Sequence, residues 1–249
     1  MVQLKISIIT VCYNSSNTLE KTIQSVAGQN YDNIEYIIVD GNSTDDTLKI
    51  IDDYKSNITK WISEPDEGLY DAMNKGIKIA TGDIIGILNS DDIFSSTTII
   101  SIIADAFKRN KCDILYGNIN YLNNENKNVR YWKSSKFIKG DFINGWHPPH
   151  PSLFVKKDVY DKDGNFDISL QISSDFELML RFFEKSNHKY FYLDKTIVNM
   201  MIGGRSNTIK GIIKGSKEIK LAFIKNKIKP AYLYLFKRYM NKIFKYIKS

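Results

Sequence analysis

The segment Asn89-Ser90-Asp91-Asp92 places two neighbouring carboxylates directly after the apolar run DIIGIL (83–88). Adjacent carboxylates repel each other, so a pair at the end of a strand is favoured when a cation binds there. A divalent ion held by one or two carboxylates, with phosphate oxygens and water in its other positions, is the usual arrangement for Mg²⁺. A solvated turn before a helix explains the same residues equally well. The segment indicates a metal and phosphate site but leaves this alternative open.

Polar residues follow three further apolar runs at the points where these runs end. Asn14 follows ISIITVC, Asp40 closes IEYIIVD, and the polar segment 64–68 follows KWIS. In open α/β sheets, ligands bind beyond the carboxyl ends of the strands. We therefore expect the four polar segments to meet at one edge of a sheet and to form a nucleotide or phosphate site.

Some of these residues have simpler explanations when each is taken alone. Asp40 is equally typical of an Asx-turn that opens GNSTDD. Asp71, Asn74 and Lys75 lie within one helical turn, where Lys75 is able to reach a phosphate. A surface helix of mixed charge explains these three residues nearly as well.

The second half of the chain adds two candidate segments. SSDFELMLR places Asp175 in the first turn of a helix, where the helix dipole favours a carboxylate whether or not it has a function. His147 and His150 in HPPHP have no cysteine or matching histidine pair, so we do not expect a zinc site. We expect these histidines to stiffen the loop or to form a polar wall of a pocket.

Apolar runs and helical patterns alternate along the first half, which predicts right-handed βαβ units and a mostly parallel sheet flanked by helices. Asn17 and Glu20 have the spacing of a capping box, and Gly82 is expected to end the helix over 70–80. The expected strands of this half are 6–14, 34–40, 60–63 and 83–88. Further on we expect strands at 112–122 and 128–133, a stiff loop at 145–155 and a helix at 173–185.

Composition places the chain among ordinary globular proteins, because 43% of its 249 residues are hydrophobic and 25% are charged. Its two cysteines, Cys12 and Cys112, match no metal or redox spacing, which favours a reducing cytosol. The N-terminus turns polar too early for a signal peptide, and we find no apolar stretch long enough to span a membrane.

Positive charge is concentrated at the C-terminal end. The net charge is +11 over residues 210–249, where Glu218 is the one acidic residue, and −4 over the rest of the chain. The lysines of this tail alternate with isoleucine, leucine, phenylalanine and tyrosine, a pattern typical of a helix that lies on an anionic membrane surface. A lysine-faced helix packed on the core, or a disordered end, would have the same composition.

Five segments in order resemble family 2 of the glycosyltransferases, which has the GT-A fold: ISIITVCYN, IIVDGNSTDDT, EPDEGLYDAMNKG, GILNSDD and SSDFELMLR. The likeness covers about residues 4 to 205 and is greatest to bacterial enzymes that build exopolysaccharide or O-antigen repeat units. It implies a GT-A domain over residues 1–208, with a nucleotide-sugar-binding half at about 1–110 and an acceptor-binding half at about 111–208. A basic amphipathic helical tail would follow at 209–249.

The resemblance also implies residue roles. Asp175 would be the general base, and Asp91 would bind Mn²⁺ or Mg²⁺ with Asp92 supporting it. Asn89 stands where an aspartate is usual, but an amide still hydrogen-bonds a ribose hydroxyl. The loop GGRS (203–206) would lie near the active site. The residues expected to bind the nucleotide-sugar are Thr10, Tyr13, Asn14, Asp40, Gly68, Asn74, Lys75, Asn89 and Ser90.

The implied activity is an inverting, metal-dependent transfer of a sugar from a nucleotide-diphosphate sugar, with UDP-sugars favoured, to a hydroxyl group. A single carboxylate base without a protein nucleophile gives one displacement, which inverts the anomeric centre. The acceptor would be a glycan or a polyprenyl-diphosphate-linked saccharide of cell-surface polysaccharide biosynthesis. The enzyme would work in the cytoplasm as a peripheral protein of the inner membrane face.

Three other classes of protein share part of this pattern. A sugar nucleotidyltransferase would need a glycine-rich, basic loop after the first strand, and CYNSSNTLEK is not one. A nucleic-acid-binding protein would explain the tail but not the carboxylates, which repel phosphates, so we expect no nucleic acid partner. A catalytically inactive nucleotide-sugar-binding protein is disfavoured because both Asp91 and Asp175 are present.

Overall fold

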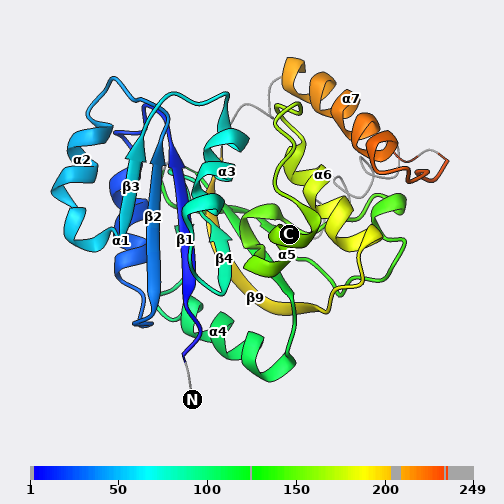
Figure 1. The fold of residues 1–249 in the computed structure, drawn as a ribbon, viewed down its shortest axis with the longest axis horizontal. Helices are drawn as coiled ribbons and strands as arrows, with labels where there is room; N and C mark the ends of the chain where they lie inside the picture. The colour runs from blue at the N-terminus through cyan, green and yellow to red at the C-terminus, as the bar shows by residue number, and fades with distance from the viewer. Residues whose placement is uncertain (1–2, 124, 203–208, 233, 235–249) are drawn as a thin grey trace.

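A computed structural model describes residues 3–123, 125–202, 209–232 and 234 of the chain. Within these residues, nine strands form one sheet in the order β3-β2-β1-β4-β8-β6-β9-β5, and β7 pairs with β6 outside this path (Figure 1). The strands are β1 (Ile6–Cys12), β2 (Ile34–Asp40), β3 (Lys60–Ser63), β4 (Ile84–Ile87), β5 (Ile93–Phe94), β6 (Ile114–Leu122), β7 (Asn128–Trp132), β8 (Phe154–Lys156) and β9 (Tyr190–Met201).

Helices cover both faces of the sheet. They are α1 (Leu19–Ala27), α2 (Thr47–Asp53), α3 (Leu69–Ile79), α4 (Ile99–Asn110), α5 (Lys157–Asp163), α6 (Ser174–Leu180) and α7 (Ile209–Lys225). Short 3₁₀ turns lie at Lys55–Asn57, Phe142–Asn144 and His150–Ser152, and α6 continues as a π-helical turn over Arg181–Lys185. The α/β class predicted from the alternating pattern is confirmed.

The first four strands in the sheet order β3-β2-β1-β4 are parallel, as predicted. Their register aligns Cys12 with Asp40 and Asp40 with Ser63, so these three strands end at the same level. The polar segments that follow them therefore meet at one edge, because parallel strands all present their carboxyl ends there.

The second half of the sheet is mixed. Strand β8 pairs antiparallel with both β4 and β6, whereas β6 and β9 run parallel to each other. The mostly parallel character predicted for the whole sheet thus holds for its first half. In the second half, β8 reverses direction and carries the chain from the loop after β7 back alongside β4.

Alternation along the buried strands divides the core into two clusters. Ile9 and Val11 pack with α3 and α6 on one face, whereas Ile6 and Ile8 pack with α1 and α4 on the other. Successive side chains of a strand point to opposite faces, so a run of apolar residues such as β1 is buried on both. The parallel strands are in this way held rigidly below the edge that carries the polar segments.

Two local predictions are wrong. Helix α1 begins at Leu19 after Thr18 without a side-chain cap, and Glu20 instead accepts a hydrogen bond of 2.7 Å from the Tyr54 hydroxyl. Helix α3 ends at Ile79, with Ala80 as its C-cap, before Gly82. A Cβ atom at Gly82 would lie 2.6 Å from Ser7 Oγ, so close packing against β1 requires this glycine.

Helix α7 begins the basic tail and lies alongside α6, at the side of the molecule away from β3 (Figure 1). Its buried residues Ile219, Ala222 and Phe223 belong to the same core cluster as Phe176 of α6. None of the helices in the described part of the chain is long and apolar enough to cross a bilayer. Residues 203–206 and most of the tail beyond Tyr232 lie outside the described residues.

Candidate active site

The segment 89–92, for which the sequence predicts a metal site, follows β4 at the carboxyl edge of the sheet. It is called the metal segment below. The Asp91 side chain is exposed, whereas Asp92 is fully buried and accepts a hydrogen bond of 3.1 Å from Asn89 Nδ2. Burial, and secondly the charge of Asp91, raise the pKa of Asp92 to about 7. A cation bound nearby would instead lower the pKa of Asp92, because a positive charge favours the ionised carboxylate.

The oxygen atoms of this segment fit a divalent cation. Asn89 Oδ1 and Asp92 Oδ1 are buried and have no hydrogen-bond partner among the described residues. In the same part of the chain no three side chains of His, Cys, Asp and Glu form a metal cluster. Two carboxylates without further protein ligands suit an ion whose other positions are filled by phosphate and water.

Asp40 is fully buried at the end of β2 and links the loop that follows β2 to the end of β3. Its oxygens accept hydrogen bonds from Ser43 N at 3.0 Å, Ser43 Oγ at 2.5 Å and Ser63 Oγ at 2.6 Å. The hydrogen bonds between Asp40 and Ser43 agree with the Asx-turn, which was the alternative interpretation of Asp40 from the sequence. Because these three donors and the Cys12 thiol, whose Sγ lies 3.6 Å from Oδ1, already occupy the carboxylate, Asp40 in this geometry shapes the carboxyl edge of the sheet rather than facing a ligand.

The loop after β1 offers one exposed ring to the edge. Tyr13 is 56% exposed, and Asn14, in the left-handed region with φ of 49°, accepts a hydrogen bond of 2.9 Å from Thr44 N. Ser15 lies 2.9 Å from Ser90, oxygen to oxygen, and so joins this loop to the metal segment. Thr10 is different, because it is fully buried within β1 beside the Tyr36 hydroxyl, and its side chain does not line the site.

The candidates on α3 separate into two groups. Gly68, with φ of 115°, begins the helix, and Lys75 Nζ forms ion pairs with Glu64 at 3.0 Å and Asp71 at 3.3 Å at the edge. Asn74 exchanges two hydrogen bonds with the main chain of Phe166, at 2.9 and 3.0 Å. Both polar atoms of the Asn74 amide are used in this way, so the residue anchors the segment before α6 and is not placed to bind a nucleotide.

Asp175 lies in the first turn of α6, as predicted, and both of its oxygens have partners. Oδ2 lies 3.0 Å from His150 Nδ1, and Oδ1 lies 3.2 Å from the hydroxyl of Tyr70 on α3. Burial raises the pKa of Asp175, but the charge and hydrogen bond of His150 outweigh it and bring the pKa down to about 2. For His150 the two effects have the opposite sign. Burial lowers the pKa of this histidine, but the charge and hydrogen bond of Asp175 have the larger effect and raise its pKa above 6.5.

Asn89, His150 and Asp175 line one small cavity, of about 20 Å³. This volume holds about one water molecule. The other residues that line it are Met73, Ile87, Leu153, Tyr160, Phe166, Leu178 and Met179. The cavity therefore joins the metal segment at the end of β4 to the carboxylate on α6, two parts of the chain that are more than eighty residues apart.

Sequence reasoning missed the partners of Asp175. Tyr70 looks like an ordinary apolar position of α3, and its hydroxyl donates to the main-chain oxygen of Ile172 at 2.9 Å. For His150 the segment HPPHP was a usable signal, and the predicted polar wall of a pocket is what the structure shows. Its pairing with Asp175 depends on the fold of β8 and α6 and has no sequence signature.

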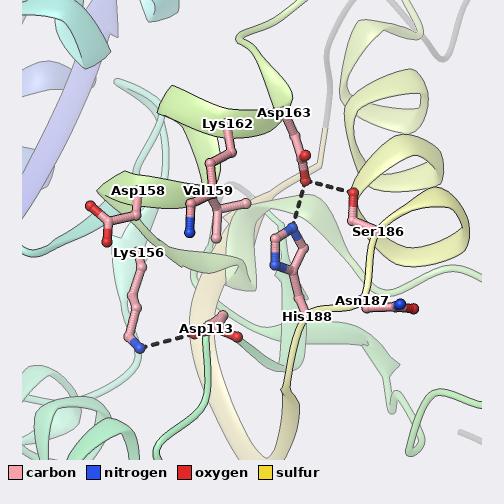
Figure 2. A pocket seen from close by; sticks show the side chains of 9 residues that line it. All are labelled: Asp113, Lys156, Asp158, Val159, Lys162, Asp163, Ser186, Asn187 and His188. Atoms are coloured by element: carbon pink, nitrogen blue, oxygen red, sulfur yellow. Dashed lines mark hydrogen bonds and ion pairs between the residues drawn. The ribbon is translucent and has the colours of Figure 1, made fainter.

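A larger hollow of about 450 Å³ lies at the Lys156 end of β8 (Figure 2). Lys156 aligns with Ile84 at the start of β4, so this hollow is at the opposite edge from the metal segment. Four of its charged side chains form two pairs, Lys156 with Asp113 at 2.9 Å and His188 with Asp163 at 2.5 Å. These internal pairs make the hollow a structural feature.

Comparison with known proteins gives a consistent result. Residues 7–169 match the model of the family "Glycosyl transferase family 2". An uncharacterized glycosyltransferase of Mycobacterium tuberculosis is 31% identical over 182 residues, which are 71% of this chain and 68% of the relative. The glucosyltransferase WfgD of Escherichia coli, which uses UDP-Glc and α-D-GlcNAc-diphosphoundecaprenol by its name, is 34% identical over 48% of this chain and 47% of its own length.

Solved structures share the fold. S. aureus TarS 1–349 in complex with UDP-GlcNAc superimposes with a TM-score of 0.70 over 94% of this chain and 69% of that chain, at 19% identity. The mannosyltransferase PcManGT from Pyrobaculum calidifontis, in complex with GDP-Man and Mn²⁺, gives a TM-score of 0.67 over 98% of this chain and 70% of that chain, at 14% identity. The predicted GT-A fold is confirmed, and the chain belongs to glycosyl transferase family 2.

Proposed function

We propose that the protein is an inverting glycosyltransferase that moves a sugar from a nucleotide-diphosphate sugar to a hydroxyl group of a glycan or lipid-linked saccharide. The observation that carries this proposal is the shared cavity of Asn89 and Asp175. It brings a carboxylate base next to the segment that would hold the leaving diphosphate. A single displacement needs both at one reacting centre.

Asp175 takes the proton of the acceptor hydroxyl in this mechanism. With its pKa at about 2 it is ionised at neutral pH, and His150 and Tyr70 fix the direction of its two oxygens. The acceptor oxygen attacks C1 of the sugar from the face opposite the diphosphate, and the configuration at C1 inverts.

The donor lies along the carboxyl edge of the parallel strands. Tyr13 offers its exposed ring to the base, and Asn14, Ser90 and Asn89 offer polar groups to ribose and diphosphate. Asp91 and Asp92 would hold Mn²⁺ or Mg²⁺, which neutralises charge on the leaving diphosphate. Gly68 and Lys75 border this site, and Lys75 would exchange one of its carboxylate partners for a phosphate oxygen.

Relatives and neighbours support the choice of substrates. The names of WfgD and of the TarS complex contain UDP-sugars, which favours a UDP-sugar donor here. The WfgD acceptor is a diphosphoundecaprenol-linked sugar, which supports an acceptor on a polyprenyl diphosphate in cell-surface polysaccharide biosynthesis. The Mn²⁺ of the PcManGT complex supports metal dependence.

A donor screen tests this function. Nucleotide release is measured with UDP-, GDP- and dTDP-sugars, with and without Mn²⁺, in the presence of a polyprenyl-diphosphate-linked saccharide. We expect release above the acceptor-free background with a UDP-sugar and Mn²⁺, and NMR of the product should show an inverted anomeric centre. Tight nucleotide binding without transfer to any acceptor would instead identify a binding protein.

The exposed face of α7 is our proposed contact with the inner membrane face. Ile213 is 54% exposed and Ile224 is 70% exposed, and both project from the side that faces away from α6, together with Lys217 and Lys220. Apolar side chains between lysines bind anionic lipid surfaces through burial and charge together. Flotation with anionic liposomes should fall for the double variant Ile213→Ser, Ile224→Ser, and equal flotation of both proteins would reject the contact.

A further inference from the structure

Glu218 is the one acidic residue in the basic segment 210–249, and it is buried at 5% exposure on the inner side of α7. Its carboxylate accepts three hydrogen bonds from consecutive main-chain N–H groups. Oε1 accepts from Gln171 at 3.1 Å, and Oε2 accepts from Ile172 at 2.8 Å and Ser173 at 2.9 Å. Hydrogen bonds to a charged acceptor are about twice as strong as neutral ones, so this carboxylate is a firm attachment point.

The attached segment leads directly into the catalytic helix. Ser173 is the residue before α6 and makes no side-chain cap to the helix, because its hydroxyl donates instead to the main-chain oxygen of Gly215 on α7 at 3.2 Å. Asp175 follows two residues later. A Cβ atom at Gly215 would lie 3.3 Å from Ser173 Oγ, so α7 packs closely against this segment.

Helix α3 holds the same segment from the other side. The Tyr70 hydroxyl donates to the main-chain oxygen of Ile172 and also lies 3.2 Å from Asp175 Oδ1. Ile172 is thus held by Tyr70 at its carbonyl and by Glu218 at its N–H. Both contacts act on the residues that enter α6, and Asp175 lies in the first turn of this helix, so the position of its carboxylate depends on them.

We propose that Glu218 is a positioning residue for the general base, and that α7 is a structural part of the catalytic centre. This inference rests on the proposed function, because it assigns Asp175 the role of base. Loss of the carboxylate leaves three N–H groups without their acceptor and frees segment 171–173 to shift. A shift of about 1 Å at a reacting group costs up to about 100-fold in rate.

The test is Glu218→Gln in the full-length protein, because glutamine keeps the size of the side chain but sets an NH₂ group against at least one of the three N–H donors, which then has no acceptor. We expect kcat to fall by about 10- to 100-fold, while the Kd for UDP in Mn²⁺ changes by less than about twofold. The amides of residues 171–173 should exchange faster with deuterium. The matched control is Glu35→Gln, which removes another buried carboxylate, 1% exposed, at the opposite edge of the sheet.

A selective loss of kcat in Glu218→Gln, absent from Glu35→Gln at equal thermal stability, supports the proposal. The proposal is overturned if kcat stays within about twofold of wild type, or if both variants lose the same fraction of kcat. An inactive wild-type protein would contradict the proposed function separately. In that case hydrogen exchange still tests whether Glu218 holds the segment before α6. Unchanged protection of residues 171–173 in Glu218→Gln would show that the carboxylate does not hold them.

Discussion

The two halves of the sheet place their functional residues by different means. In the parallel half, the edge proposed to bind the donor is built from loops that follow neighbouring strands, and Asp40 connects one of these loops to the end of β3 through Ser43 and Ser63. In the mixed half, Asp175 lies on a short helix that is held by Tyr70 of α3, His150 of the loop before β8 and Glu218 of α7 through residues 171–173. The proposed donor edge thus follows from chain order, whereas the surroundings of the proposed base, Asp175, are assembled from distant segments.

The sharpest way to separate the two halves is Asp175→Asn. Turnover should fall by about 100- to 10,000-fold, since removal of a general base has this effect, while the Kd for UDP stays unchanged. Asp158→Asn is a matched control, because Asp158 lies in the first turn of α5 and is exposed near the far hollow (Figure 2). An active Asp175→Asn enzyme would disprove the assignment of the base.

Asp91→Ala should affect the donor half alone. We expect donor binding in Mn²⁺ to weaken by at least the roughly 10- to 100-fold that loss of a supporting residue costs at metal sites. Calorimetry with UDP, with and without Mn²⁺, measures the difference. If Asp91→Ala binds UDP equally well and with the same metal dependence, the carboxylate is not a ligand.

Asp40→Asn should reveal the structural basis of the donor edge. The amide cannot accept from all three donors, and buried donors without acceptors cost about 1–3 kcal/mol in the free energy of unfolding. Urea unfolding of Asp40→Asn and wild type measures this loss. A variant of unchanged stability whose UDP binding is lost would show instead that Asp40 contacts the base directly.

The pairing of His150 with Asp175 predicts a smaller effect that depends on pH. The raised pKa of His150 means that its share of stability is present below pH 6.5 and is lost as pH rises through that pKa. The lowered pKa of Asp175 means that its share is present above pH 3.8 and is lost as pH falls towards about 2. The stability advantage of wild type over His150→Gln should therefore be largest between about pH 4 and 6.5.

Catalysis should show the opposite pH dependence, because a protonated His150 makes Asp175 a weaker base. We expect kcat of wild type to rise as pH passes above 6.5 and this limb to disappear in His150→Gln. His188→Gln is the control, since His188 pairs with Asp163 in the far hollow (Figure 2) and should keep the limb. If the limb persists in His150→Gln, another group controls the protonation of the base.

Several features of the fold were predictable because they depend on local pattern. The span of β2 over 34–40 and of β3 over 60–63 follows from short apolar runs, and the order of strand and helix fixes a parallel arrangement. The position of Asp175 in the first turn of a helix was predictable from the segment SSDFELMLR. Mixed pairing of β8 was not predictable, because three residues carry no signal of direction.

The polar segments that follow β1, β2, β3 and β4 show where the sequence by itself was sufficient. The four polar strand ends predicted the edge at which these segments meet, and the alternation of apolar runs and helical patterns predicted the class of fold. This worked because parallel strands bring their carboxyl ends to one edge whatever the side chains elsewhere. Tertiary structure alone decided that Thr10 and Asn74 face inward, that His150 pairs with Asp175, and that Glu218 holds the segment before α6. Such contacts join residues tens of positions apart, and only packing determines which of them meet.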